Sequence, residues 1–529
     1  MSRISILTHS GEAAPLLTTG EKEPGRAILR DLQLDKTMLL LCPDAAPREA
    51  LLHAMAVPCT DPEDIRFRYR AGQVFQDHPA LLDNLLTIFL RLNQTKNAWD
   101  QDRSRLFAHR RAAPSDLTLQ LTGSRDVLGL TAMYLRSAMA HIREVSLLLE
   151  NHPDCLPVFA VFKENCDRVW RSHQPIMEFA DRCHKLLNQA YRYDIEYTLD
   201  EELRTGGFLL REFAHLRPQG AREKQKPTGL WQMLTRRPGA EETKKAENPV
   251  PETGHPLGQV KNETQLEIII GGINECDRYL TAMLRGLLDR FSLVEEELYF
   301  YLGVLRYRHA LEEKGIVTVF PEITPAETGV IEIRNLYDLL LLAGSPKDRV
   351  VPNDVHLSCL RSTDAGESRN TLPGMLIHGA NNSGKTVFLR SAGSAILLAQ
   401  CGLPIPAEEG TISIRRRLYT QFATAEGELV SGSAAGRFEE EAAALAGMLD
   451  EMEPDSLLLL NETFQTTAYG EGAAGIYPIL HYIADCGGAF VFVTHLTALL
   501  SSMKGQAVIA HTSEDPRTRY KLCMEETES

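Results

Sequence analysis

The chain has 529 residues, of which 43% are hydrophobic and 24% are charged, which is the composition of a globular protein with about two to four domains. Its net charge of −15 excludes a surface that is basic overall, so any contact with nucleic acid must be local. No Cys-x-x-Cys pair, membrane-length apolar run or signal-peptide pattern occurs, so we expect a cytoplasmic protein without a zinc module or a membrane partner.

The chain up to about residue 320 contains mostly helical patterns. Residues 1–50 mix short apolar runs with turn residues and receive no assigned role. Thr60 or Asp61 is placed to cap a helix whose first turn holds Pro62, and a second helix follows Pro79. Further helices are predicted over two ranges, 126–149 and 157–190.

A long helix is predicted over residues 275–312. Its apolar residues alternate spacings of four and three, at Leu280, Leu284, Leu287, Phe291, Val294, Leu298, Tyr301 and Leu305. This heptad pattern predicts a helix that packs along a partner helix as a rod or lever. A single long helix in a bundle core would have the same periodicity, so both interpretations stay open.

Residues 216–259 are rich in proline and carry mixed charges that lean basic. This composition predicts a mobile tip at the far end of a helical arm, which belongs to a helical core or lever region over residues 51–320. The tip could be a solvated linker or a surface that contacts phosphates of nucleic acid.

From about residue 321 to 529, short β-rich runs alternate with helical patterns. Strands are predicted over four ranges, 330–333, 375–378, 456–460 and 490–493. This alternation is typical of a parallel-sheet nucleotide-binding domain. The predicted fold is therefore multidomain, with a mostly α-helical region followed by an α/β P-loop domain.

Residues 379–386 read Gly-Ala-Asn-Asn-Ser-Gly-Lys-Thr, and they follow an apolar run and precede a helical pattern. A strand that leads through a glycine loop into a helix presents backbone N–H groups and a positive helix end to phosphates. Lys385 is expected to reach the β- and γ-phosphates of ATP, and the Thr386 hydroxyl is expected to bind Mg²⁺. The predicted nucleotide-binding residues are Gly379, Ala380, Asn381, Asn382, Ser383, Gly384, Lys385 and Thr386.

Two later strand ends supply the other candidate residues. Glu462, at the end of a buried strand, is placed to orient and deprotonate the attacking water. Asn461 stands where phosphate-loop enzymes have an Asp that binds the metal ion. Its amide oxygen could hold a metal-bound water, but the amide is uncharged. We therefore predict weak Mg²⁺ binding and slow ATP turnover. His495 ends the next strand and is the candidate sensor of the γ-phosphate. Ser433, before a Glu-rich helix, could contribute to a second anion site in a dimer.

Taken together, these residues resemble the MutS family of mismatch-repair ATPases, which are of the ABC type. The loop at 379–386 is similar to the family's Gly-Pro-Asn-x-Gly-Gly-Lys-Ser, with Asn381 at its nucleotide-contacting Asn. Val351-Pro352-Asn353-Asp354 resembles a Val-Pro-Asn-Asp stretch, and Thr494-His495 resembles a Thr-His switch. The likeness is strong over about residues 322–510 and weaker over 50–320. It implies helical levers and clamps joined to an ATPase head that dimerises around two nucleotides.

Departures from the family limit what the resemblance implies. Asn461-Glu462 stands in place of Asp-Glu, and Gly436-Arg437-Phe438 stands in place of the Ser-Thr-Phe signature, which would displace the hydroxyl of that signature to Ser433. We also expect no mismatch-reading domain before the helical core and no nuclease or Smr-like tail after residue 510. The resemblance is therefore to a short, divergent MutS-related protein.

Two functions follow from these patterns. The leading hypothesis is a homodimer that binds and slowly hydrolyses ATP with Mg²⁺, and whose heads close and swing the helical arms around DNA. The alternative is a non-catalytic switch in which ATP is a structural ligand and the arms grip a protein partner. Asn461 and the net charge of −15 favour the second, whereas Lys385, Thr386, Glu462 and His495 favour the first.

Overall fold

A computed structural model describes most of the chain. The described residues are 3–13, 19–111, 116–188, 192–199, 205–213, 263–360, 371–422, 434–464, 469–515 and 517–525. They form two compact units: Met1–Ile4 with Asn84–Leu293, and Ser5–Asp83 with Val294–Ser529.

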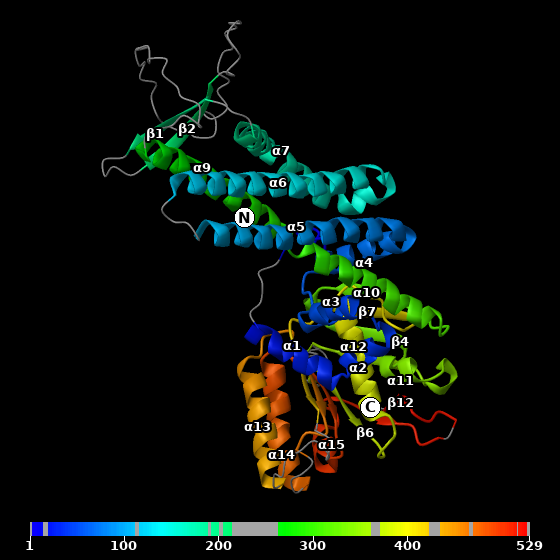
Figure 1. Ribbon diagram of the computed structural model, residues 1–529. Coiled ribbons are helices and arrows are strands. Elements are labelled where there is room, and N and C mark those ends of the chain that lie inside the picture. The colour runs from blue at the N-terminus through cyan, green and yellow to red at the C-terminus, as the bar shows by residue number, and fades with distance from the viewer. Residues whose placement is uncertain are drawn as a thin grey trace, which may run out of the picture. The chain divides into compact units, whose positions relative to one another are not determined.

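The first unit is built mainly from long helices. These are most of α5 (Pro79–Arg111), α6 (Leu117–Glu150), α7 (Leu156–Asn188) and α9 (Glu263–Arg290), with a 3₁₀ turn at Pro153–Cys155. The strands β1 (Arg192–Leu199) and β2 (Thr205–Phe213) form an antiparallel pair. Helix α6 packs against both α7 and α9 (Figure 1). The apolar residues of α6 that were expected seven apart are all buried: Leu128, Leu135, Ile142 and Leu149.

One buried polar cluster joins three of these helices. Arg103 of α5 donates to both carboxylate oxygens of Asp277 on α9, at 3.1 and 2.7 Å. The Thr131 hydroxyl of α6 donates to the same carboxylate at 2.7 Å. Charge-assisted, bidentate hydrogen bonds are directional, so they fix how α5, α6 and α9 align along one another.

The continuous helix predicted over residues 275–312 is wrong at one point. Helix α9 ends at Arg290 and α10 (Val294–Glu312) begins after a turn. Both the backbone N–H and the hydroxyl of Ser292 donate to the Asp289 carbonyl, at 3.4 and 2.8 Å. Such a serine competes with the helical hydrogen-bond ladder. The periodicity hid the break because the apolar residues on both sides of it, Phe291 and Val294, are buried.

The second unit contains the remaining helices. They are α1 (Thr19–Asp31), α2 (Leu34–Leu41), α3 (Ala45–Ala56), α4 (Pro62–Asp77), α10, α11 (Leu339–Gly344), α12 (Lys385–Gln400), α13 (Ala434–Asp450), α14 (Tyr469–Asp485) and α15 (Thr497–Met503), with 3₁₀ turns at Ala326–Thr328 and Lys347–Arg349. The predicted start of α4 is confirmed, because the Asp61 side chain accepts hydrogen bonds from the backbone of Glu63 and Asp64.

Two sheets lie in the second unit. The smaller has the order β3 (Glu322–Thr324), β7 (Glu409–Ser413), β4 (Val330–Leu336) and β5 (Asn353–Ser358). The larger has the order β12 (Leu522–Met524), β11 (Val508–Thr512), β6 (Gly374–His378), β10 (Ala489–Val493), β9 (Leu457–Asn461) and β8 (Leu418–Phe422). Its strands are parallel except for β12, which is antiparallel to β11. The four predicted strands are confirmed as β4, β6, β9 and β10.

The central strands of the larger sheet are buried on both faces. Every residue of β9 and of β10 is buried, which explains their uninterrupted apolar runs. Helix α12 is also buried along nearly its whole length and contacts both strands. The phosphate loop therefore leads from the buried strand β6 into the buried helix α12, so both of its ends are fixed in the core of the second unit.

The expected fold class is confirmed in its coarse form: a mostly helical chain with α/β sheets in its C-terminal part. Residues 5–83 belong to the same compact unit as these sheets, although the sequence analysis placed most of them with the helical core. The domain division at residues 50 and 320 stays a prediction. The proposed arm tip at 216–259 lies outside the described residues. None of the helices in the described ranges combines the length and apolarity that crossing a membrane requires.

The buried carboxyl group of Glu297, on α10, should make the stability of the folded state depend on pH. Its side chain is buried and accepts hydrogen bonds from the Ser5 hydroxyl and the Ile6 backbone, both at 2.7 Å. Burial raises its pKa from 4.5 to about 7, against the opposing effect of these hydrogen bonds. The folded state therefore holds this proton more tightly than the unfolded chain, so stability should fall as pH rises from about 4.5 to about 7.

At about 1.4 kcal/mol per pKa unit, the fall should be at most about 3.5 kcal/mol. Denaturant unfolding measured between pH 4.5 and 8 should show this component in the wild type and lose it in Glu297→Gln. Glu312→Gln, at a half-exposed position on the same helix, is the control and should retain it. An unchanged pH profile in Glu297→Gln would contradict this account.

Candidate nucleotide site

The order of strands in the larger sheet brings the predicted site residues to one edge. Strand β10 lies between β6 and β9, and Val493 pairs with Ile377 on one side and with Asn461 on the other. The phosphate loop follows β6, Glu462 follows β9, and His495 lies just beyond β10. In parallel α/β sheets, ligands bind outside the carboxyl ends of the strands.

The backbone of the phosphate loop requires its two glycines. Gly379 has φ 143° and Gly384 has φ 99°, a region that residues with a side chain rarely adopt. A Cβ atom on Gly379 would also lie 2.1 Å from the Thr512 hydroxyl oxygen. Gly384 precedes the first residue of α12, so the positive end of that helix faces the loop. Ala380, Asn381 and Asn382 at the crest of the loop are exposed.

Lys385 is held against the loop. Its residue is 4% exposed, and its Nζ donates to the carbonyls of Gly379 and Ala380 at 3.0 and 2.8 Å. Burial lowers the pKa of this amine, while the charge of Glu462 acts in the opposite direction. The ammonium is thus aligned with the loop and electrostatically linked to the carboxylate at the end of β9.

The two residues predicted to share the Mg²⁺ ion lie in contact. The Thr386 hydroxyl donates to the Asn461 Oδ1 at 3.1 Å. Asn461 is buried as the last residue of β9, whereas Thr386 is exposed at the start of α12. Two oxygen atoms at this separation suit a hard divalent cation, but both are neutral, so the pair fits Mg²⁺ with a weaker field than a carboxylate would supply.

Glu462 and His495 also lie together. The His495 Nε2 is 3.3 Å from the Glu462 Oε1, and their side chains are 28% and 32% exposed. The backbone N–H of Glu462 donates to the Val493 carbonyl at 2.9 Å, which ties the end of β9 to the end of β10. Glu462 has φ 58°, unusual for a residue with a long side chain. The His495 Nε2 atom itself is buried, and its contact with Glu462 lacks hydrogen-bond geometry, so among the residues that the structure describes it has no hydrogen-bond partner.

A segment around Tyr520 lies beside the phosphate loop and is held there by Asn353. The Asn353 side chain donates to the Tyr520 carbonyl at 3.0 Å and accepts from the Leu522 backbone at 2.8 Å. Tyr520 lies 3.5 Å from the position that a Cβ on Gly384 would take. Asn353 thus positions the segment beside the loop. The Val-Pro-Asn-Asp stretch is recognisable in the sequence, but the contact of Asn353 with Tyr520, 167 residues away, is not.

Ser433, predicted to belong to a second anion site, lies outside the described residues. The other predicted site residues fall within the second unit, at the loop and at the ends of β9 and β10. Their roles with ATP and Mg²⁺ stay predictions.

Comparisons with known proteins find similarity to MutS proteins, and the match to a family model lies in the C-terminal part of the chain. The family model described as MutS domain V matches residues 375–521. The chain is 35% identical over 245 residues to an "Endonuclease MutS2" of Acetivibrio thermocellus, which covers 46% of this chain and 27% of the relative. It is 30% identical over 222 residues to a "Putative endonuclease MutS2" of Bacillus subtilis, covering 41% and 26%.

A third relative is the "DNA mismatch repair protein MutS" of Granulibacter bethesdensis, 30% identical over 200 residues, which are 37% of this chain and 20% of the relative. The matches therefore span about a fifth to a quarter of the length of these relatives. The matched domain contains the phosphate loop, Glu462 and His495. Residues 375–521 thus match MutS domain V, and the chain is related over this part to MutS and MutS2 proteins.

Proposed function

We propose that this protein is a MutS-like ATPase that binds ATP with Mg²⁺, hydrolyses it slowly and works as a homodimer in the cytoplasm. The observation that carries the proposal is the convergence of the phosphate loop, the Thr386–Asn461 pair and the Glu462–His495 pair at one edge of the larger sheet. A glycine loop alone binds phosphate, whereas a carboxylate and an imidazole beside it suit the activation of water.

Each residue then has a chemical task. The amides of the loop and the Lys385 ammonium bind the phosphates, and the Glu462 carboxylate accepts a proton from the attacking water. His495, whose Nε2 is 3.3 Å from the Glu462 Oε1, would orient that carboxylate, and we propose that it also senses the γ-phosphate. Thr386 and Asn461 would hold Mg²⁺ or its water ligands, and the ion would neutralise charge on the phosphates.

We further propose that ATP closes two heads and moves helical arms that enclose DNA. The support is the relationship to proteins whose names describe DNA mismatch repair and endonuclease activity. The long helices α5, α6 and α9 of the first unit, which Asp277 links through Arg103 and Thr131, would form these arms. Because the net charge is −15, DNA contact would depend on a local basic surface and would weaken steeply with salt.

A second candidate function rests on Asn461. A neutral amide in place of a carboxylate lowers the attraction for Mg²⁺, which suits a protein that binds ATP without turning it over. In that case ATP would act as a dimerisation switch, and the arms would grip a protein partner instead of DNA.

Restoring a carboxylate at position 461 separates these candidates. Asn461→Asp should raise the Mg²⁺-dependent rate of ATP hydrolysis, by about tenfold if the added charge contributes about 1.4 kcal/mol more in the transition state than in the ground state. The measurement is phosphate release over a Mg²⁺ titration. Asn97→Asp, at an exposed position of α5 in the first unit and outside the candidate site, is the matched control and should not raise the rate. The absence of any gain in Asn461→Asp would contradict this account of the residue.

The function as a whole is tested by sedimentation of the full chain with ATP and Mg²⁺, with and without a labelled duplex or branched DNA. Nucleotide-dependent dimerisation and DNA co-sedimentation that falls with salt would support the DNA-enclosing ATPase. Dimerisation without DNA binding at low salt would favour the switch that grips a protein, and would exclude the role on DNA.

A further inference from the structure

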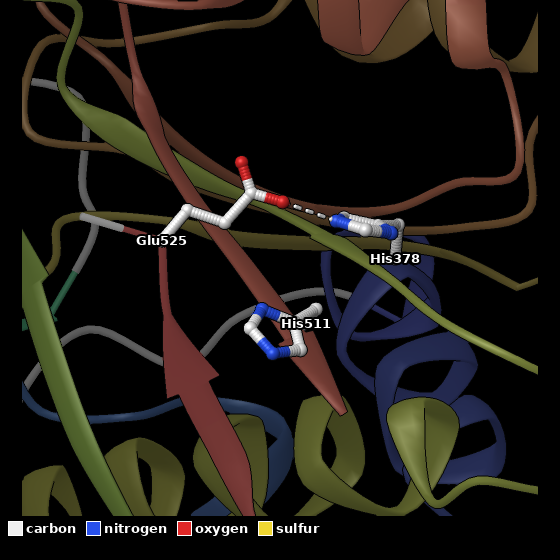
Figure 2. Close-up of side chains that lie close together, drawn as sticks. All are labelled: His378, His511 and Glu525. Atoms are coloured by element: carbon white, nitrogen blue, oxygen red, sulfur yellow. Dashed lines mark hydrogen bonds and ion pairs between the residues drawn. The ribbon is translucent and has the colours of Figure 1, made fainter. Parts of the chain in front are cut away.

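Three side chains with metal-binding atoms meet beside the phosphate loop. His378 is the last residue of β6, and His511 is its direct partner in the parallel pairing with β11. Glu525 follows β12, which pairs with the other side of β11. Figure 2 shows the Glu525 carboxylate reaching the His378 ring, with the His511 ring beside both.

The geometry is compact and open to solvent. One ligand atom from each of the three residues lies within 4.8 Å of the others. The His378 Nε2 is 2.6 Å from the Glu525 Oε1, and the centres of the two imidazole rings are 6.0 Å apart. The side chains of His378 and Glu525 are 31% and 39% exposed, so an ion in solution could reach them.

The strands support this arrangement. The Glu525 backbone N–H donates to the Ile509 carbonyl of β11 at 2.9 Å, which holds the residue against the strand that carries His511. All three side chains therefore start from backbone positions that the sheet determines. Because these ligands are already arranged, less conformational entropy is lost when an ion binds to them.

We propose that His378, His511 and Glu525 form a site for a divalent transition metal, with Zn²⁺ as the ion of choice. Two imidazoles and one carboxylate are ligands that Zn²⁺ accepts, and three protein ligands leave a position for water. Mg²⁺ is a poor candidate because it prefers a shell of oxygen atoms. Binding would replace the hydrogen bond between His378 and Glu525 and would require both imidazoles to be neutral.

The site is separate from the predicted ATP site but adjoins the same loop. His378 directly precedes Gly379, and the residue after His511 is Thr512, whose hydroxyl donates to the Ser383 hydroxyl at 2.7 Å. None of the three ligands was predicted to bind ATP or Mg²⁺. The inference thus goes beyond the proposed function, and Zn²⁺ binding is measured without nucleotide, so that either can fail without the other.

The test is calorimetric titration of Zn²⁺ into the 529-residue chain after treatment with a chelator. The wild type should bind Zn²⁺ at one site that is weakened at least about tenfold in His378→Ala, in His511→Ala and in Glu525→Gln, because each removes a ligand. His356→Ala, on the exposed face of β5, is the matched control and should bind like the wild type. Equal Zn²⁺ affinity in wild type and His511→Ala would overturn the proposal and leave a simple hydrogen bond between His378 and Glu525.

Cysteines provide a second possible source of Zn²⁺ binding, so a second readout is needed. Co²⁺ bound by imidazole and carboxylate should give weak visible bands without sulfur-to-metal charge transfer. Strong charge-transfer bands that persist in His511→Ala would assign the bound ion to cysteines and contradict the site. If His511→Ala melts well below the wild type without metal, His511→Gln, which keeps a polar side chain of similar size, takes its place in both measurements.

Discussion

Glu462→Gln should lower the rate of ATP hydrolysis by about 10²- to 10⁴-fold, because the amide cannot accept a proton from the attacking water. ATP affinity should change little, since the variant leaves intact the loop and Lys385, which are proposed to bind the phosphates. The variant should therefore accumulate as an ATP-bound dimer. Single-turnover phosphate release, nucleotide binding and sedimentation measure these three properties on the same preparation.

Two further variants make the result specific. Lys385→Ala should lose ATP binding itself, since it removes the cation that the loop positions. Glu451→Gln, at an exposed position after α13, is the matched control for a lost carboxylate and should hydrolyse ATP like the wild type. If Glu462→Gln hydrolyses ATP as fast as the wild type, Glu462 is not the base, and the non-catalytic switch becomes the better account.

Arg390→Met should destabilise the protein by about 3–5 kcal/mol, because it leaves a buried carboxylate without its partner. Arg390 of α12 donates to both oxygens of Asp338, at 2.9 and 2.8 Å, and the two side chains are 10% and 4% exposed. Asp338 also accepts from the Leu341 backbone and so caps α11. Denaturant unfolding at pH 7, with unfolding followed by circular dichroism, measures the loss.

Two comparisons isolate the buried charge as the cause. Arg334→Met breaks exposed pairs with Glu408 and Glu409 and should cost at most about 1 kcal/mol. The double variant Arg390→Met with Asp338→Asn removes both charges, keeps an N-cap residue and should recover much of the stability. A double variant as unstable as Arg390→Met alone would show that packing, and not the unpaired charge, causes the loss.

Local sequence patterns were sufficient for much of the fold. The cap at Asp61, the buried strands β9 and β10, and the path from β6 through the loop into α12 all follow from neighbouring residues. Each depends on interactions within a few residues or on burial of a continuous run, which composition and spacing encode directly. The break between α9 and α10 was missed because the apolar spacing continues across Ser292 while the hydrogen bonding does not.

The sequence by itself therefore determined the start of α4, the buried strands β9 and β10, and the phosphate loop between β6 and α12. Only the tertiary structure decided that β10 lies between β6 and β9, which places His495 beside Glu462. It also decided that Glu525 meets His378 across 147 residues of chain. Strand order depends on how whole elements pack against each other, and no short stretch of residues carries that information.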